Sequence, residues 1–340
     1  MISDPGRNSR AQQALIAALQ TGRTMAVTGA GLSWWAGYPT WRELIAHLAD
    51  AVRDRRGAEV NVDLIVENNQ NPLHCLQKLG AELVQRSAFE EFIRTEFRPV
   101  PPRDPSVLGA FLNLPFHHIA TLNFEESLER AHSALGRPFG STSSANAYEI
   151  VDFLRKMNEP SHPRQIFHLH GKVSDPQGRI ILTEDDYSGL YHRNPLFTRM
   201  LWLLAASRTL VFFGFGFTDP DFVRSLEDAR RDIGVYGNCH YAVIPLGQND
   251  NDVERRNHFH NSFLIEPIFY EAANSGDGHD HDGFVSLLRN ISETLGVPER
   301  AVAPPAILAV APEAGDLQII ERLAERFVQR VDPGDVDVPR

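Results

Sequence analysis

An asparagine and a histidine stand where two apolar segments end, and both side chains could do chemistry. Asn123 follows the segment 118–122, and His170 follows the segment 166–169. An imidazole can take a proton from a hydroxyl group or from water near neutral pH, and an amide can hold a hydroxyl group or a water in place. A single histidine in such a position can also be a buried residue that only forms hydrogen bonds.

A glycine-rich loop is a second candidate for ligand binding. Gly29, Ala30 and Gly31 directly follow the apolar segment 24–28. Small residues let a backbone approach a ligand closely, and the amides of such a turn can bind a pyrophosphate as a helix N-terminus does. The dinucleotide pattern G-x-G-x-x-G is not matched, because its last position is Trp34. The loop can therefore also be purely structural.

The elements around these residues predict an α/β fold. Compact apolar runs alternate with helical patterns, which indicates a Rossmann-like, doubly wound parallel sheet. Apolar residues at helical spacing predict a helical insertion subdomain at about 40–115. The predicted strands are 24–28, 118–122, 166–169, 179–182, 210–213, 241–244 and 263–268. The predicted helices are 11–19, 126–135, one that begins near 184, one that begins at Pro220 after the N-cap Asp219, and 284–295.

Unusual segments follow four of the predicted strands. They are residues 29–33, 122–125, 168–171 and 214–217. In doubly wound sheets, ligands bind outside the carboxyl ends of the strands. We therefore expect these four segments to form one site.

The composition excludes several classes of protein. Of the 340 residues, 42% are hydrophobic and 23% are charged, which is typical of globular proteins with one large domain or two modest ones. The formal charge of −11 repels phosphate backbones and anionic lipids, so we expect no direct nucleic-acid binding. Two cysteines exclude a four-thiolate zinc site and favour a reducing compartment. Residues 1–10 hold no apolar signal segment and glycines interrupt the apolar stretch 200–217, so we expect a cytoplasmic protein that does not enter a membrane.

Two histidine-containing segments could suggest a metal. His168 precedes His170 by two residues and is expected on the same face of the strand, but no third ligand is placed by the sequence, so we expect no metal there. Residues 279–283 (HDHDG) are expected to form a solvated loop in which Asp282 caps the next helix.

Three tryptophans follow the glycine loop. They are Trp34, Trp35 and Trp41. Such rings can stack on an aromatic group of a ligand or pack as a lid against the core.

The longer string that contains the glycine loop resembles the sirtuins. Residues 29–33 (GAGLS) are similar to the GAG-x-S loop of that family, and residues 37–42 (GYPTWR) resemble its G-x-P-x-F-R segment. Three further segments follow in family order. They are 121–125 (TLNFE), similar to T-x-N-x-D, 169–171 (LHG), similar to the catalytic L-H-G, and 211–217, similar to the strand end that holds the adenosine-side ribose.

The departures from the sirtuin pattern point to one branch of the family. Sirtuin deacylases carry a four-cysteine zinc module after the catalytic histidine, whereas no cysteine lies between His170 and Val211. Glu125 replaces the usual aspartate. Residues 180–187 and 213–221 resemble the zinc-free bacterial sirtuin-like branch, whose members hydrolyse NAD+ in anti-phage defence.

The resemblance implies roles for the matching residues, with NAD+ as the substrate and without a metal. Asn123 would position the nicotinamide ribose or a water, and His170 would act as the base. Ser33 and the glycine-loop amides would bind the diphosphate, and Arg42 would be a lid or a phosphate contact. The implied NAD+-binding residues are Gly29, Ala30, Gly31, Ser33, Arg42, Glu125, Gly214, Gly216 and Asp221.

The resemblance also implies regulation, because an enzyme that depletes NAD+ to arrest or kill an infected cell must be held off until it is triggered. We expect a catalytic domain over residues 1–300 and a homo-oligomer, or a separately encoded partner such as a hexameric ATPase or a short Argonaute. Residues 301–340 would be a linker and a C-terminal helix that could contact the partner. Two alternatives stay open: an NAD-dependent protein deacylase, and a non-catalytic sensor of NAD+ or ADP-ribose.

Overall fold

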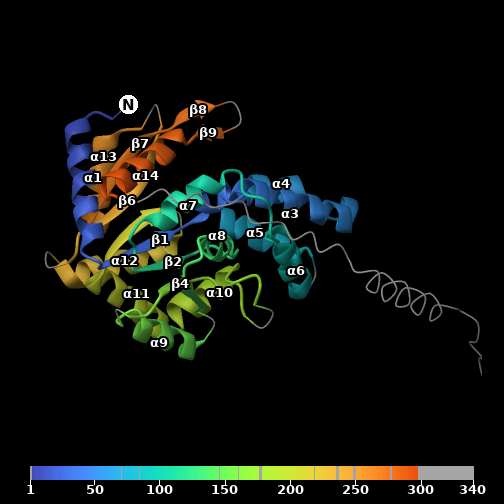
Figure 1. Ribbon diagram of the computed structural model, residues 1–340. Coiled ribbons are helices and arrows are strands. Elements are labelled where there is room, and N and C mark those ends of the chain that lie inside the picture. Colours follow the sequence, from blue (N-terminus) through green and yellow to red (C-terminus); the bar gives the residue numbers. More distant parts are fainter. Residues whose placement is uncertain are drawn as a thin grey trace, which may run out of the picture. The chain divides into compact units, whose positions relative to one another are not determined.

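Seven parallel strands form the centre of the protein. The computed structural model describes residues 2–297, apart from residues 70, 84, 145, 160, 176–177, 218, 235–236, 248–249 and 276–277. The strands are β1 (Thr24–Thr28), β2 (His118–Thr121), β3 (Phe139–Ser143), β4 (Arg164–His168), β5 (Thr209–Phe213), β6 (His240–Leu246) and β7 (Ile265–Glu271). They lie in the order β3-β4-β2-β1-β5-β6-β7, and every neighbouring pair is parallel (Figure 1). The predicted doubly wound α/β fold is confirmed.

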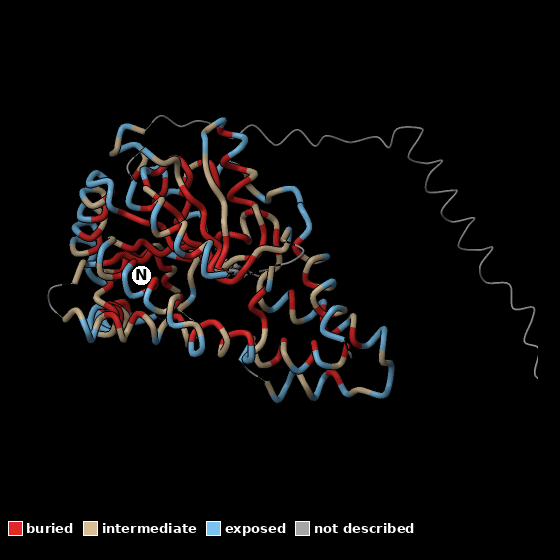
Figure 2. Tube along the Cα trace, turned by 90° about the horizontal axis from the view of Figure 1, so that it is seen from below, coloured by how far each residue is buried: buried red, intermediate tan, exposed pale blue. Residues whose placement is uncertain are grey.

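An apolar core lies on each face of the sheet. Alternate residues of β1 point into the two cores: Ala26 belongs to one, and Met25 and Val27 belong to the other. Because helices cover both faces, all strands except the edge strand β3 are buried along most of their length (Figure 2). The first core includes residues of α1 (Pro5–Gln20), α8 (Ser127–Ala134) and α14 (Asp282–Thr294). The second includes residues of α9 (Ala147–Lys156), α11 (Pro195–Ser207), α12 (Pro220–Ile233) and α13 (Asp252–Phe263).

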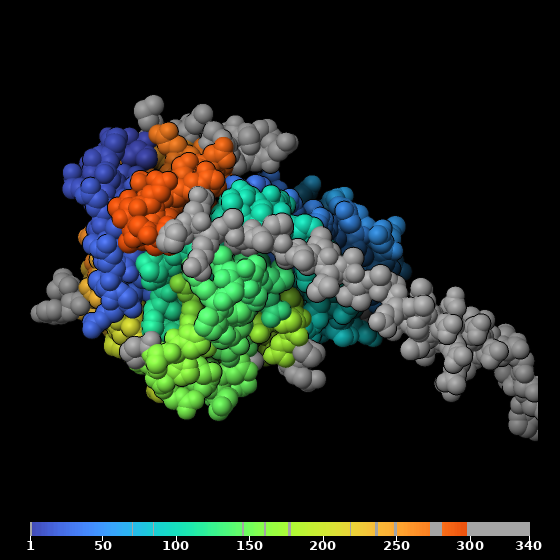
Figure 3. Space-filling view, viewed as in Figure 1, coloured from blue at the N-terminus to red at the C-terminus, as the bar shows by residue number. Residues whose placement is uncertain are grey.

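The N-terminal helix is attached to the far edge of the sheet. The side chain of Asn8 on α1 accepts a hydrogen bond from the backbone nitrogen of Phe269 on β7 at 2.8 Å and donates one to its carbonyl oxygen at 2.9 Å. In the space-filling view, α1 lies beside α14 on one face of the molecule (Figure 3). The first and last described helices therefore close the same side of the sheet.

The predicted helical insertion lies between β1 and β2. Its elements are α3 (Trp41–Arg56), the 3-10 turn η1 (Gly57–Glu59), α4 (Val62–Asn68), α5 (Pro72–Ala81), α6 (Arg86–Glu96) and α7 (Pro105–Asn113). Local signals begin these helices: Thr40 and Glu43 form a capping box at α3, and Asn71 caps α5 in front of Pro72.

One predicted strand is wrong, and one strand of the seven-stranded sheet, β3, was not predicted. Residues 179–182 are not a strand, although Ile180 and Ile181 are buried. They fill the core as an irregular segment, in which the nitrogen of Ile181 donates to the carbonyl oxygen of His170 at 3.0 Å. The place beside β4 is taken by β3, whose sequence FGSTS is polar because an edge strand needs no continuous apolar run.

The remaining elements are short, and the end of the chain lies outside the described residues. They are α2 (Ala30–Trp35), α10 (Glu184–Tyr187), the π-helical turn η2 (Ser188–His192), and the antiparallel pair β8 (Ala273–Ser275) and β9 (Gly278–Asp280). Contacts divide the chain into Met1–Pro304 and Pro305–Arg340, and every described residue belongs to the first unit. The linker and helix predicted for 301–340 are therefore not described. Among the described helices, none is long and apolar enough to cross a membrane.

Candidate active site

The ends of four strands meet at one edge of the sheet. Thr28 at the end of β1 is paired with Thr121 on β2 and with Phe213 on β5, and Thr121 is paired with His168 on β4. Because these strands end at the same level, the four segments singled out from the sequence begin side by side. The geometry agrees with the rule that sites in doubly wound sheets lie beyond the carboxyl ends of the strands.

Backbone hydrogen bonds and close contacts at three glycines join the loop after β1 to the loop after β5. Gly29 donates a backbone hydrogen bond to the oxygen of Phe213 at 3.1 Å, and Gly31 donates one to the oxygen of Gly214 at 2.9 Å. A Cβ atom on Gly29 would lie 2.7 Å from the oxygen of Gly214, so the two backbones touch where a side chain would be. Two of the amides predicted to bind a diphosphate are thus used to join the loops, and that binding role stays a prediction.

Asn123 is anchored at its backbone and at its side chain. Its backbone nitrogen donates to the Thr121 hydroxyl at 3.1 Å, and its Nδ2 donates to the carbonyl oxygen of Gly29 at 3.0 Å. Its Oδ1 makes no hydrogen bond to any described residue. This oxygen can therefore accept a hydrogen bond from a sugar hydroxyl or from a water.

Ser33 and Glu125, both predicted to bind NAD+, are bonded to each other. The Ser33 hydroxyl donates to Oε1 of Glu125 at 2.7 Å, and the Ser127 hydroxyl donates to the same oxygen at 2.8 Å. Both Ser33 and Glu125 are buried, and burial raises the pKa of the Glu125 carboxyl. The pair connects the loops after β1 and β2 beneath the edge of the sheet.

His170 is a neutral, buried imidazole. It is only 2% exposed, and burial lowers its pKa to about 3. Its Nε2 lies 2.9 Å from the Tyr191 hydroxyl, and its Nδ1 lies 3.5 Å from the Tyr187 hydroxyl. Because the ring is uncharged at neutral pH, it can accept a proton.

Asp219 is a site residue that the sequence predicted first as a helix-start residue and second as a neighbour of the adenosine site. It was predicted as the N-cap of α12, and its Oδ1 does accept a hydrogen bond from the nitrogen of Phe222 at 3.0 Å. Its Oδ2 also lies 3.7 Å from Nε2 of His170. Burial raises the pKa of Asp219 to about 6. Tyr187 and Tyr191 were not predicted as site residues, because no spacing in the sequence connects them with His170.

The expectation that His168 and His170 share a face is wrong. β4 ends at His168, and the following residues leave strand geometry in a turn at Gly171, whose φ is +85°. The His168 ring contacts Glu129 on α8, whereas the His170 ring contacts Tyr191 on the opposite face of the sheet. Among the described residues, no group of three or more histidine, cysteine, aspartate or glutamate side chains could hold a metal ion.

The other predicted NAD+-binding residues are less enclosed. Arg42 is exposed on the first turn of α3, and Gly216 is exposed in the loop before α12. Asp221 lies in the first turn of α12, and its Oδ1 is 3.1 Å from Nε2 of His192. A role in NAD+ binding stays a prediction for each of them.

The tryptophans and the histidine-rich segment are mainly structural. Trp35 and Trp41 pack against the first core, and the Arg103 guanidinium lies 4.8 Å from the centre of the Trp34 ring. Residues 278–280 form β9 rather than a loop. Asp282 was expected to cap α14, but it is the first residue of that helix, and His281 holds the N-cap position.

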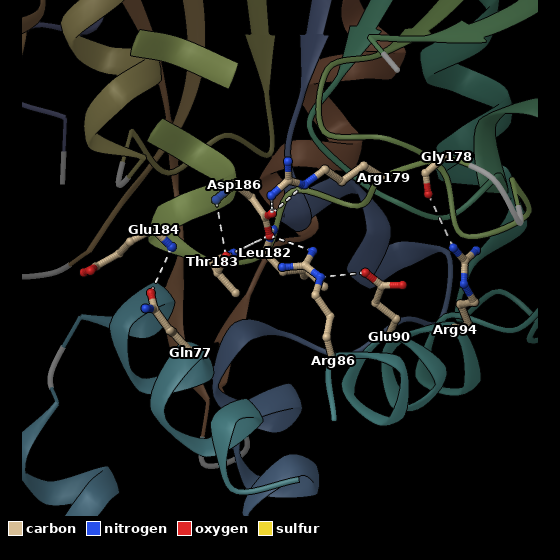
Figure 4. Close-up of polar contacts among 10 residues, drawn as sticks. All are labelled: Gln77, Arg86, Glu90, Arg94, Gly178, Arg179, Leu182, Thr183, Glu184 and Asp186. Atoms are coloured by element: carbon tan, nitrogen blue, oxygen red, sulfur yellow. Dashed lines mark hydrogen bonds and ion pairs between the residues drawn. The ribbon is translucent and has the colours of Figure 1, made fainter. Parts of the chain in front are cut away.

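A buried carboxylate joins the helical insertion to the segment that follows His170. Figure 4 shows Arg86 of α6 and Arg179 converging on Asp186, whose side chain is fully buried. Asp186 also accepts hydrogen bonds from the backbone nitrogens of Leu182 and Thr183. The next residue, Tyr187, packs its ring against His170 with the ring centres 5.1 Å apart. Gln77 of α5 and Arg94 of α6 add contacts to Glu184 and Gly178 of the same segment (Figure 4), so the insertion is linked to the candidate active site at several points, of which Asp186 is the buried one.

Comparisons with known proteins agree with this geometry. Residues 117–268 match the SIR2-like domain family. NAD(+) hydrolase ThsA of Bacillus cereus (strain MSX-D12) is 26% identical over 223 residues, which cover 64% of this chain and 42% of that protein. NAD(+) hydrolase ThsA of Enterococcus faecium is 22% identical over 248 residues, covering 71% and 47%. Defense-associated sirtuin 2 of Bacillus subtilis is 21% identical over 215 residues, covering 62% and 20%.

The matches confirm the predicted resemblance to the sirtuin-like NAD+ hydrolases of anti-phage defence. The matching domain includes Asn123 and His170 but begins after the glycine loop. The chain spans less than half the length of the curated relatives it matches.

Proposed function

We propose that this chain, through its SIR2-like domain, hydrolyses NAD+ to nicotinamide and ADP-ribose. The observation that carries the proposal is that Asn123 and His170 follow the ends of the neighbouring strands β2 and β4. Oδ1 of Asn123 has no hydrogen-bond partner among the described residues, and the imidazole of His170 is buried and neutral. The relatives that are NAD(+) hydrolases by name support the same reaction.

The residues can serve each step of this hydrolysis. The bond between nicotinamide and ribose breaks through an oxocarbenium-like centre, and nicotinamide leaves as a neutral ring with the electron pair on its nitrogen, so no strong general acid is needed. Oδ1 of Asn123 would hold a ribose hydroxyl or the attacking water. His170 would take the proton that the water loses as its oxygen bonds to the ribose carbon.

Asp219 extends this scheme. A carboxylate 3.7 Å from His170 favours the imidazolium that forms when the ring accepts a proton. Since burial raises the pKa of Asp219 to about 6, the carboxylate is ionised at neutral pH. The hydroxyl of Tyr191, at 2.9 Å, fixes the orientation of the ring.

We also propose a place for the reaction in the cell. Cytoplasmic NAD+ depletion during phage infection would stop growth of the infected cell, a role supported by the relative that is a defense-associated sirtuin by name. Self-assembly or a partner protein, such as an ATPase or a short Argonaute, would hold the activity off until infection. Segment 301–340 is our candidate for that contact.

The test is NAD+ consumption by the purified chain with its products resolved by chromatography. Wild type should release nicotinamide and ADP-ribose without any peptide, whereas Asn123→Ala and His170→Ala should lose at least about 100-fold in rate. His260→Ala, on the exposed surface of α13, is the control and should match wild type. Thermal unfolding confirms that the variants are folded.

Other outcomes would contradict the proposal. Nicotinamide release that requires an acyl-lysine peptide would instead identify a deacylase. Tight NAD+ binding without cleavage, also in the presence of candidate partners, would identify a sensor. Full activity of both site variants would exclude this site.

A further inference from the structure

The last residue of β4 carries a buried imidazole with both nitrogens bonded. The side chain of His168 is completely buried. Its Nδ1 lies 2.9 Å from the backbone oxygen of Asn123, and its Nε2 lies 2.7 Å from Oε1 of Glu129 on α8. The sheet register produces this contact, because His168 is paired with Thr121, two residues before Asn123.

These bonds determine where the protons lie. A backbone oxygen can only accept, so Nδ1 of His168 carries a hydrogen that points at Asn123. Burial alone would lower the pKa of His168, but the Glu129 carboxylate raises it. Burial would likewise raise the pKa of Glu129, but His168 and the Ser141 hydroxyl, at 2.6 Å, lower it. Both shifts favour the charged forms of the pair, an imidazolium and a carboxylate.

Stability alone is a weak reason for such a pair. Desolvation of two buried charges offsets most of their attraction, and apolar side chains of similar shape often serve as well. What apolar side chains could not supply is a hydrogen-bond donor aimed at the carbonyl oxygen of Asn123. The other anchors of Asn123, Thr121 and Gly29, belong to β2 and to the loop after β1. His168 is thus the anchor on β4, the strand that leads into His170.

We propose that His168 and Glu129 are positioning residues that hold Asn123 at a set distance from His170. The inference rests on the proposed NAD+ hydrolysis and names two residues that the sequence resemblance does not assign to the reaction. Glu129 holds the imidazole from one side, and the imidazole holds the asparagine backbone from the other. Loss of the Nδ1 donor should misplace the Asn123 amide while the substrate still binds.

Two variants of His168 separate the two bonds. The amide nitrogen of asparagine can occupy the place of Nδ1, and that of glutamine can occupy the place of Nε2. His168→Asn therefore keeps a donor for Asn123 and gives up Glu129, whereas His168→Gln keeps Glu129 and gives up Asn123. His168→Asn leaves the buried carboxylate of Glu129 without its partner, whereas His168→Gln leaves only a backbone oxygen without a donor, so we expect the larger drop of the thermal midpoint in His168→Asn.

The measurements are kcat and KM for NAD+, and hydrogen exchange of the backbone amides of residues 121–126, on the full chain. His168→Gln should lower kcat about 10- to 100-fold with KM within about 3-fold, because a misplaced group affects the reaction more than binding. It should also speed exchange in 121–126. His168→Asn should stay within about 5-fold of wild type in kcat and should keep the wild-type exchange.

A variant of the partner residue gives a second test. The amide of Glu129→Gln can donate to Nε2 of a neutral His168, which leaves the Nδ1 hydrogen in place, so kcat should stay within about 5-fold of wild type. Glu129→Leu has no such group, so it should lower kcat more than Glu129→Gln does.

Two results would overturn the proposal. One is a loss of kcat that is larger in His168→Asn than in His168→Gln and so follows their thermal midpoints, which is the behaviour of a purely structural pair. The other is identical exchange of residues 121–126 in both variants. The exchange result is independent of turnover, so a wild-type chain that does not cleave NAD+ would contradict the proposed function and leave the positioning role to be decided by exchange.

Discussion

The hydroxyl of Ser33 donates a 2.7 Å hydrogen bond to Oε1 of Glu125, and this bond joins the loop after β1 to the loop after β2. Ser127 donates to the same oxygen at 2.8 Å. Because the carboxyl is fully enclosed, burial raises its pKa and charge at this position is unfavourable. Glu125 therefore serves the fold as a buried acceptor between two loops that both approach the candidate active site.

A neutral acceptor should replace Glu125 with little loss. Glu125→Gln keeps an Oε1 for both serine hydroxyls, so its free energy of unfolding should lie within about 1 kcal/mol of wild type at pH 7. Glu125→Ala leaves two buried hydroxyls without that acceptor and should cost about 2–4 kcal/mol. Urea unfolding measures both. Equal losses in the two variants would contradict the acceptor role.

The close approach of the loops after β1 and β5 predicts a steric effect of substitution at Gly214. Gly214 has φ +59°, and a Cβ there would lie 2.4 Å from the backbone nitrogen of Leu32, so Gly214→Ala should cost at least about 3 kcal/mol. Gly22 has a similar φ of +67° but no atom within 4 Å of the same position, so Gly22→Ala should cost about 1 kcal/mol for the conformation alone. Similar thermal midpoints for the two variants would mean that the loops can separate without cost.

Asp219 predicts a pH dependence of stability. Because burial raises its pKa from 3.8 to about 6, the folded protein keeps this proton longer than the unfolded chain, so the group lowers stability as pH rises from about 4 to above 6. Asp219→Asn keeps the N-cap acceptor and removes the charge. The free energy of unfolding of this variant should match that of wild type near pH 4 and should exceed it by up to about 3 kcal/mol above pH 7.

The same substitution should act in the opposite direction on the reaction. Without the carboxylate beside His170, the imidazolium that forms during hydrolysis is less stable, so kcat of Asp219→Asn should fall about 10-fold or more. Denaturant unfolding curves from pH 4 to 8 test the predicted gain of stability, and NAD+ turnover at pH 7 tests the predicted loss of kcat. A variant that is less stable than wild type at pH 8 would contradict the assignment of a raised pKa.

Replacing the buried Asp186 should lower the free energy of unfolding more than replacing a carboxylate on the surface does. Its buried side chain binds two arginines and two backbone nitrogens, so Asp186→Ala should cost about 2–4 kcal/mol, reduced from the usual loss for buried pairs because both arginines are partly exposed. Burial alone would raise the pKa of Asp186, but Arg86 and the other polar contacts lower it. The stability that these contacts contribute is therefore present above about pH 4 and is lost as pH falls below it.

A matched control is the exposed ion pair of Asp63 with Arg53, whose Asp63→Ala variant should leave the thermal midpoint unchanged within error. If the two aspartate variants behave alike, Asp186 does not fasten the helical insertion to the segment after His170.

Sequence alone was sufficient for the fold class and for the ends of the strands that carry the site. Apolar runs of four or five residues, bounded by glycines and polar residues, are local signals, and so is the Asp219–Pro220 start of α12. Motif order was also sufficient to identify Asn123 and His170 as candidates. These features depend on residues close together in the chain, so periodicity and spacing can reveal them.

Only the tertiary structure decided which side chains meet. Asp219 lies beside His170, and Glu129 lies beside His168, although the residues of the first pair are 49 positions apart in the sequence and those of the second pair are 39 apart. The direction of the His170 ring depended on where β4 ends, since a side chain changes face when the chain leaves strand geometry. The apolar run 179–182 did not become a strand, because β3 already occupied the place beside β4. Burial and hydrogen bonding between distant segments set these outcomes, and no local pattern records them.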